Sequence, residues 1–200
     1  MKQFLLISVI LMQAIVGFSQ TVKISGRVGA QSASLGYVPK NFVASCLDLV
    51  TGDRIDIDLD SASFLFDGLT AGHDYKVWVY HTSNEDYLNG VSTLDIVMVS
   101  RHILGISPLD HITKRIAADA NNDRKISAAD IIELRKLILG IQTTLYTSWK
   151  VVTNRSLEEN TWPLPSSNLT DTYIFTNLSE NISDADFTLV KIGDINGNSQ

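Results

Sequence analysis

The chain of 200 residues contains a single cysteine, Cys46, and only four prolines. One cysteine cannot form an intrachain disulfide, and Cys46 lies too far from the N-terminal segment to be the lipid-bearing cysteine of a lipoprotein. The chain must therefore gain its order from packing, from bound ions, or from both. We expect Cys46 to be a small buried residue.

Positive charge is also scarce. The chain carries 16 Lys and Arg against 22 Asp and Glu, a formal net charge of -6, and it has no long basic run. This balance excludes a nucleic-acid-binding surface and favours cations or neutral partners as ligands. The hydrophobic content of 44% is sufficient to build a core.

Catalytic motifs are absent from the sequence: there is no G-x-S-x-G, no H-E-x-x-H and no P-loop. The histidines are scattered along the chain at His73, His81, His102 and His111. Asp184 and Asp186 could form a glycosidase-type carboxylate pair, but two acids on one side of a strand usually form a solvated face. We therefore predict a protein that is not an enzyme.

Long hydrophobic runs are confined to the N-terminus. An apolar run at residues 4–16 follows Lys2 and is followed by the small residues Gly17 and Ser19. The run is too short to span a bilayer comfortably, so residues 1–19 are predicted to be a secretory signal peptide. The alternative is a buried N-terminal strand or helix. We expect a secreted, extracellular or cell-surface protein with no segment inserted in a membrane.

Residues 21–80 show the period-two pattern of half-buried strands. The stretch "RIDIDLD" at 54–60 alternates charged and apolar residues, and "YKVWVYH" at 75–81 buries every second side chain if it is a strand. Turn formers separate these runs, so residues 20–82 are predicted to form a small antiparallel β-sandwich. Further strand-like runs within a C-terminal β-rich segment, residues 146–200, should extend or cover a sheet.

The sandwich region resembles the Ig-like folds of the carboxypeptidase-regulatory and Cna-B type. These folds carry an opening "SGRV" strand and the pattern F-x-F-x-G-L-x-x-G-x-x-Y-x-V, matched here by Phe64, Phe66, Gly68, Leu69, Gly72, Tyr75 and Val77. The resemblance implies a scaffold or spacer domain without catalytic residues.

An internal repeat follows. "DIVMVSRHILG" at 95–105 and "DIIELRKLILG" at 130–140 match with an offset of 35 residues. Apolar residues recur at i, i+3 and i+7 in both copies, which predicts two amphipathic helices that pack stripe to stripe and antiparallel. The stripes are Ile96, Val99, Ile103 and Ile131, Leu134, Ile138. A glycine suited to the C′ position closes each copy.

The second copy is preceded by "DANNDRKISAAD" at 119–130, which has the spacing of an EF-hand-like calcium loop. Calcium requires six to eight oxygens, supplied from loop positions 1, 3, 5, 7, 9 and 12. The predicted ligands are Asp119, Asn121, Asp123, the carbonyl of Lys125, Ser127 and Asp130. Arg124 stands at position 6, where a sharp turn favours glycine, and should weaken the site. The alternative is a solvated loop that caps a helix.

The first copy, "NEDYLNGVSTLD" at 84–95, is less complete. Its candidate ligands are Asn84, Asp86, the carbonyl of Gly90, Ser92 and Asp95, while Leu88 occupies position 5. The sequence leaves open whether this copy binds a second calcium ion. A third fragment, "DINGN" at 194–198, repeats positions 1, 3 and 5 and could complete a site whose second half is "GVSTLD".

Residues 84–141 resemble the type I dockerin module, in which each calcium loop ends in Asp and is followed by a helix. The whole chain resembles the dockerin-containing secreted proteins of Bacteroidetes-type bacteria. The complete fold class is therefore expected to be α+β: a small antiparallel β-sandwich, a dockerin-like pair of calcium loop-helix repeats, and C-terminal strands.

The dockerin resemblance implies a cohesin-like protein partner and the assembly of extracellular complexes, which in this setting could degrade polysaccharides. It places partner recognition at loop positions 10 and 11 and on the helices: Thr93, Leu94, Ala128, Ala129, Ser100, Arg101, Arg135 and Lys136. The alternative for these residues is an ordinary cap or surface role. Two other functions stay open: a calcium-stabilised structural or adhesive spacer, and a carbohydrate-binding β-sandwich that uses exposed aromatic side chains, with Trp78, Tyr80, Trp149 and Trp162 as candidates.

Overall fold

The computed structural model describes residues 20–30, 40–83, 85–159 and 169–199. The expected signal peptide at 1–19 lies outside the described residues. Among the residues that are described, no helix is both long enough and apolar enough to cross a bilayer.

The chain combines strands and helices, as the sequence predicts. Five strands come first: β1 (Thr21–Ala30), β2 (Phe42–Asp48), β3 (Arg54–Asp58), β4 (Ser63–Thr70) and β5 (Tyr75–His81). Three helices follow: α1 (Thr93–Ile103), α2 (Ile112–Ala118) and α3 (Ala128–Ile138). The chain then forms β6 (Trp149–Thr153), α4 (Asn154–Glu159), β7 (Thr172–Phe175) and β8 (Phe187–Lys191).

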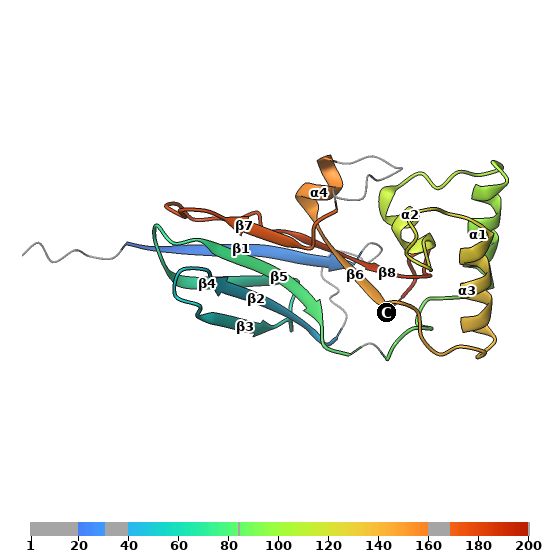
Figure 1. Ribbon diagram of the computed structural model, residues 1–200, viewed down its shortest axis with the longest axis horizontal. Coiled ribbons are helices and arrows are strands. Elements are labelled where there is room, and N and C mark those ends of the chain that lie inside the picture. The colour runs from blue at the N-terminus through green and yellow to red at the C-terminus, as the bar shows by residue number, and fades with distance from the viewer. Residues whose placement is uncertain (1–19, 31–39, 84, 160–168, 200) are drawn as a thin grey trace, which may run out of the picture.

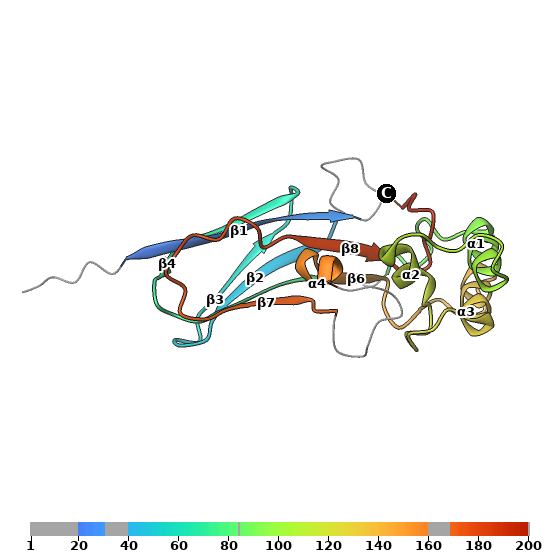
Figure 2. The same cartoon turned by 90° about the horizontal axis from the view of Figure 1, so that it is seen from above.

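The strands form two four-stranded sheets, with orders β4-β1-β8-β6 and β3-β2-β5-β7. Figures 1 and 2 show the two sheets as layers of an elongated body, with α1, α2 and α3 gathered at one end. The pairing is antiparallel except between β1 and β8, which run parallel. The expectation that C-terminal strands extend a sheet is confirmed, because β6 and β8 lie in one sheet and β7 in the other.

The period-two pattern explains the core between the sheets. Tyr75, Val77 and Val79 of β5 are buried in the same cluster as Ile24 of β1, which belongs to the opposite sheet. The pattern was wrong for Ile55, which is 43% exposed although Ile57 on the same strand packs against the core.

Cys46 lies in this core, as expected. It sits on β2 and is a free, buried thiol. Burial, assisted by the nearby charge of Asp48, raises the pKa of the Cys46 thiol to about 12. The thiol is therefore protonated at neutral pH and behaves as a small apolar side chain.

A second cluster holds the helices to the end of the sandwich. Val99 of α1 and Leu134 and Leu137 of α3 pack in one buried cluster with Val190 of β8 and Ile192 just after it. The predicted pairing of the two repeat helices is confirmed, since α1 contacts α3. Ile103 was predicted wrongly: it is 41% exposed, because the buried positions of α1 all fall in its first two turns.

Both repeat helices end as their glycines predict. Gly105 and Gly140 adopt φ values of 68° and 66°. The following amides reach back to the helix, from Ile106 N to the Arg101 carbonyl and from Ile141 N to the Lys136 carbonyl, both at 2.9 Å. This is the Schellman arrangement, in which a left-handed residue lets the last carbonyls be satisfied.

One tight approach in the sandwich generates a prediction. A Cβ at Gly26 of β1 would lie closer than 3.0 Å to the Ala185 carbonyl and the Phe64 ring, whereas a Cβ at Gly29 would meet nothing within 4 Å. Gly26→Ala should therefore lower the free energy of unfolding by about 1–3 kcal/mol, the usual range for overpacking. Urea denaturation measures this, with Gly29→Ala on the same strand as the matched control. Equal midpoints for the two variants would contradict the close packing of β1.

Candidate metal centre

The second predicted loop, residues 119–130, connects α2 to α3. Asp119 is the C-cap of α2, and Ser127 is the N-cap of α3. Helix α2 was not predicted from the sequence, although the i, i+4 spacing of Ile112 and Ile116 was a signal for it. The loop is therefore held by a helix on each side.

The first and last residues of this loop are buried carboxylates. Asp119 is 5% exposed and Asp130 is fully buried. Asp119 accepts hydrogen bonds from the amides of Asp123 (3.0 Å) and Arg124 (2.9 Å). Asp130 accepts from the amides of Asn121 (3.3 Å) and Ser127 (2.8 Å). The backbone thus winds around both carboxylates.

The remaining predicted side-chain ligands lie within the same turn of chain. Asn121 Oδ1 accepts from the amide of Asp123 at 2.9 Å, and Asp123 Oδ1 accepts from the amide of Lys125 at 2.8 Å. Arg124 takes the left-handed conformation that its position requires, with φ of 67°. For a residue other than glycine this costs about 1–2 kcal/mol, and the loop nevertheless adopts it.

Helix capping accounts for part of this geometry. Ser127 and Asp130 form a capping box at the start of α3, and Ser92 and Asp95 form the same box at the start of α1. A capping box satisfies backbone amides and has no need of a metal ion. The capping box does not explain the burial of Asp119, because Asp119 lies at the other end of the loop, beside further acidic residues.

The buried negative charge of the loop is not offset by an ion pair in the described part of the chain. Lys150 interacts electrostatically with Asp119, but the two side chains form no ion pair. Burial raises the pKa of Asp119 to about 6, and the charges of Asp130 and Asp123 act in the same direction. Burial also raises the pKa of Asp130. Within the described part of the chain, no Lys, Arg or His side chain forms an ion pair with either carboxylate. A bound cation would supply the missing positive charge.

The donor set suits a hard cation. The described residues contain no group of three or more His, Cys, Asp or Glu side chains placed to hold a metal ion. The three aspartates of this loop are therefore not gathered closely enough to hold a metal ion alone, and a calcium ion here would also need the amide oxygen of Asn121, the hydroxyl of Ser127 and the carbonyl of Lys125. Such mixed oxygen ligands are typical of calcium loops.

The first predicted loop is arranged differently. Asn84 lies outside the described residues, and Asp86 is exposed and accepts a hydrogen bond from Asn89 Nδ2 at 2.7 Å. Gly90, at position 7 of this loop, takes the left-handed conformation, with φ of 75°. Asp95 is fully buried and accepts from the Ser92 amide at 2.9 Å. The two acidic candidates of this loop therefore have different surroundings: Asp86 is exposed to solvent, whereas Asp95 is buried.

The predicted partner-binding residues lie at the N-termini and on the surfaces of α1 and α3. Six of them are exposed: Thr93, Leu94, Arg101, Ala128, Ala129 and Arg135. Ser100 is half-buried and donates to the Ile96 carbonyl, and Lys136 forms an ion pair with Glu133 at 2.8 Å. The exposed six are available to a partner, whereas Ser100 and Lys136 have intramolecular roles.

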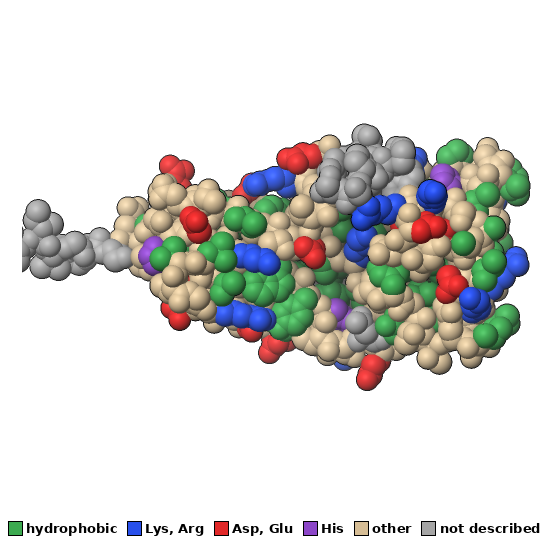
Figure 3. Space-filling view, viewed as in Figure 1, with side chains coloured by type: hydrophobic (Ala, Val, Ile, Leu, Met, Phe, Trp, Pro, Cys, Tyr) green, Lys and Arg blue, Asp and Glu red, His purple; other side chains and the backbone are tan. Residues whose placement is uncertain are grey.

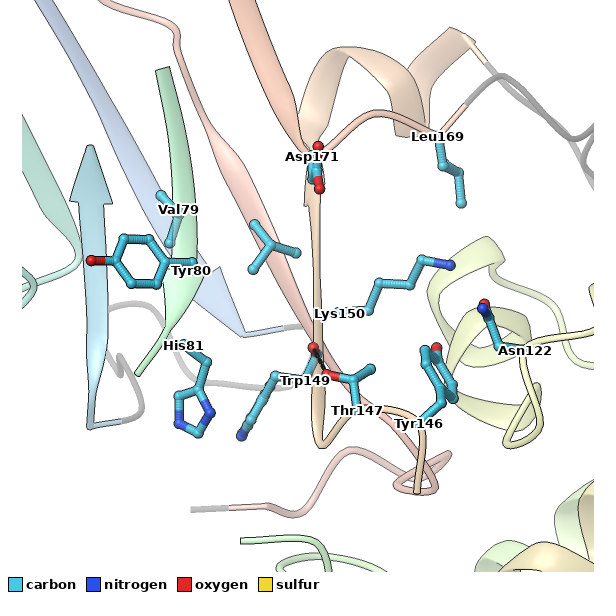
Figure 4. A pocket seen from close by; sticks show the side chains of 11 residues that line it. Val79, Tyr80, His81, Asn122, Tyr146, Thr147, Trp149, Lys150, Leu169 and Asp171 are labelled. Carbon is cyan, nitrogen blue, oxygen red and sulfur yellow. Dashed lines mark hydrogen bonds between the residues drawn. The ribbon is translucent and has the colours of Figure 1, made fainter. Parts of the chain in front are cut away.

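A cleft of about 410 Å³ lies beside the second loop. Figure 4 shows Asn122 of the loop facing Lys150 of β6, with Tyr146 beside Asn122 and Trp149 farther away, beside His81. Trp149 is largely buried, and its ring packs edge-on against Phe42 at 5.8 Å between centroids. Trp149 is thus a packing residue, and Trp162 lies outside the described residues, so neither forms an observed platform for a sugar.

The raised pKa of Asp119 generates a prediction about pH. Its folded value of about 6 exceeds the ordinary carboxyl value, so the folded state without calcium binds the extra proton below that pH. In chelator, wild-type stability should fall by about 1–3 kcal/mol as pH rises from about 4 to 7. The fall should be smaller in Asp119→Asn.

Thermal unfolding across this pH range, with and without calcium, measures the effect. Saturating calcium should reverse the slope, because the ion binds only the ionised carboxylate. The same dependence of stability on pH in wild type and Asp119→Asn would show that burial does not raise the pKa of Asp119.

Comparison with known proteins gives a match over the segment that contains the internal repeat. No curated protein and no solved structure matches the chain. Residues 84–139 match the family model of the Dockerin type I domain, and they include both loops and both repeat helices. Type I dockerins bind calcium and dock to cohesin domains. Residues 84–139 are therefore similar to the Dockerin type I domain, and strands of the sandwich precede and follow them.

Proposed function

We propose that this chain is a secreted, non-catalytic docking protein that binds calcium through residues 119–130 and presents α1 and α3 to a cohesin-like partner. One observation carries the proposal: the buried carboxylates of Asp119 and Asp130 accept hydrogen bonds from backbone amides and form no ion pair with any described residue. The dockerin match supplies the class of partner.

Calcium would be held by oxygen atoms from six positions of the loop. The proposed ligands are Asp119, Asn121, Asp123, the carbonyl of Lys125, Ser127 and Asp130. The ion offsets the desolvated negative charge of the carboxylates. Because the same carboxylates fix the end of α2 and the start of α3, calcium binding should stabilise the positions of both helices.

Exposed apolar side chains on the repeat helices support a protein partner. Leu94 and Val97 on α1 and Ile132 on α3 are each about half exposed, at 53%, 49% and 50%. Leu104 and Leu139, at the ends of these helices, are more exposed still. Figure 3 shows hydrophobic side chains on the outer surface at this end of the molecule. Apolar side chains gathered on one surface are characteristic of protein interfaces.

The two copies present different residues to a partner. Thr93 and Leu94 occupy loop positions 10 and 11 in the first copy, whereas Ala128 and Ala129 occupy them in the second. A partner that reads these positions would distinguish the copies. We therefore propose one docking orientation rather than two equivalent ones.

The β-sandwich has a scaffold role in this proposal. It is proposed to be an Ig-like spacer that carries the dockerin-like segment within a larger extracellular assembly of the polysaccharide-degrading kind. The second candidate function is a calcium-stabilised structural spacer without a partner. The packing of the helices on β8 supports that alternative, because a purely structural spacer needs its parts to be held rigidly together.

The first test is a calcium titration of the chelator-treated chain without residues 1–19. Wild type should bind calcium by isothermal titration calorimetry, and Asp119→Asn combined with Asp123→Asn should weaken the site in residues 119–130 by at least about tenfold, because two charged ligands are lost. Asp110→Asn is the matched control, since Asp110 is exposed and pairs with Lys114 outside the loop. An unchanged titration in the double variant would exclude this loop as the site.

Docking is tested with a panel of cohesin domains. Leu94→Glu should weaken binding by about 1–3 kcal/mol if Leu94 is an anchor of the interface, and chelator should abolish binding. Ile174→Glu is the control, because Ile174 is an exposed apolar residue on β7, distant in sequence from the helices. Calcium-dependent folding without binding to any cohesin would favour the spacer.

A further inference from the structure

The C-terminal segment 194–199 lies directly against the end of the first loop. Asp95 Oδ1 accepts hydrogen bonds from the amides of Ile195 (2.8 Å) and Asn196 (3.2 Å), residues about a hundred positions away in sequence. A Cβ at Gly90 would come within 2.7 Å of Asp194 Oδ2. Two segments distant along the chain therefore meet around the carboxylates of Asp95 and Asp194.

The approach is enforced by packing. Asp95 is fully buried and Asp194 is 1% exposed. Gly193 takes φ of 87°, and a Cβ there would lie 2.9 Å from Leu134 Cδ2 and 3.0 Å from Val91 Cγ2. Ile195 is fully buried in the cluster that holds α1 and α3. Packing alone therefore holds this segment against the helices, without a bound ion.

The first carboxylate of this pair is wrapped as Asp119 is. Asp119 accepts from the amides four and five residues later. Asp194 accepts from the amides of Gly197 (2.7 Å), Asn198 (3.1 Å) and Ser199 (2.8 Å), which are three, four and five residues later. The fourth position is left-handed in both segments, with φ of 59° at Asn122 and 73° at Gly197.

The last carboxylate is also wrapped in the same way. Asp130 accepts from the amide of Asn121 at loop position 3 and from Ser127 at position 9. Asp95 accepts from Asn196 and from Ser92. Residues 194–199 therefore correspond to positions 1–6 of a calcium loop, and residues 90–95 correspond to positions 7–12.

We infer that these two segments form a second, discontinuous calcium site. Its ligands are Asp194, Asn196, Asn198, the carbonyl of Gly90, Ser92 and Asp95. This set offers oxygen at the same six positions as residues 119–130. Asp194, Asn196 and Asn198 lie outside the dockerin match, whereas Gly90, Ser92 and Asp95 lie within it. The inference requires neither docking nor calcium at residues 119–130.

An orphaned oxygen points independently to a ligand. Asn196 Oδ1 is buried and has no hydrogen-bond partner in the described structure. A buried acceptor without a donor is costly, and a cation at the centre of the ligand set satisfies it. The nearby ammonium of Lys191 donates to the Tyr87 carbonyl at 2.9 Å and forms no ion pair with Asp95 or Asp194.

The site explains why the first copy of the repeat departs from the loop pattern. Leu88 stands at position 5 of the contiguous loop, and its side chain is 52% exposed. In the discontinuous site Asn198 supplies position 5, so residues 84–89 need not provide ligands. A bound ion would also fix the C-terminal segment to the start of α1.

The experiment isolates this site by removing the other one. In the Asp119→Asn, Asp123→Asn background, calcium titration of the chain without residues 1–19 should still show one ion. Adding Asn196→Ala and Asn198→Ala should weaken that ion at least tenfold. These two variants should leave the melting temperature in chelator nearly unchanged, because Asn196 Oδ1 lacks a partner and Asn198 is exposed.

Asp86→Asn in the same background is the matched control and should have no effect. If Asp86→Asn weakens the ion and the Asn196 and Asn198 changes do not, the contiguous loop 84–95 holds the metal and the inference is wrong. If the background binds no calcium up to millimolar concentration, the weak end of extracellular sites, the inference is also overturned. If wild type and the background both bind one ion with the same affinity, residues 119–130 hold no calcium and the proposed function fails, whereas this second site stands.

Discussion

The helical end of this protein depends on buried carboxylates that form no ion pair with the described residues. Asp119 and Asp130 lie in one loop, and Asp95 and Asp194 lie in a second arrangement of the same form. Backbone amides orient all four, but amides alone offset only part of the cost of burying a negative charge. The start of α1, the end of α2 and the start of α3 are all attached to these groups. Their positions are therefore coupled to whatever supplies the positive charge.

The sandwich and the helices are joined through β8 and the residues that follow it. Leu189 contributes to the core between the sheets, while Val190, Ile192 and Ile195 contribute to the cluster beneath the helices. A single short segment thus belongs to both cores. This continuity gives the helical end a fixed base on the sandwich.

The local features could be read from the sequence because each depends on residues close together in the chain. The 12-residue spacing identified the loop at 119–130, and the glycines at 105 and 140 identified the helix ends. Ile103 and Ile55 were predicted wrongly because periodicity identifies a face, whereas burial depends on whether another element covers it. Helix α2 was missed because its seven residues give too short a periodic pattern.

The sequence by itself determined the strands of the sandwich, the repeat with its two helices, and the chemistry of its oxygen-rich loops. Only the tertiary structure decided that β6 and β8 join β1 in one sheet while β7 joins β5 in the other, because strand partners are chosen by the packing of distant segments. It also decided that Asp95 meets residues 194–199. That contact joins positions about a hundred residues apart, and the burial of Ile195 beneath the helices brings them together.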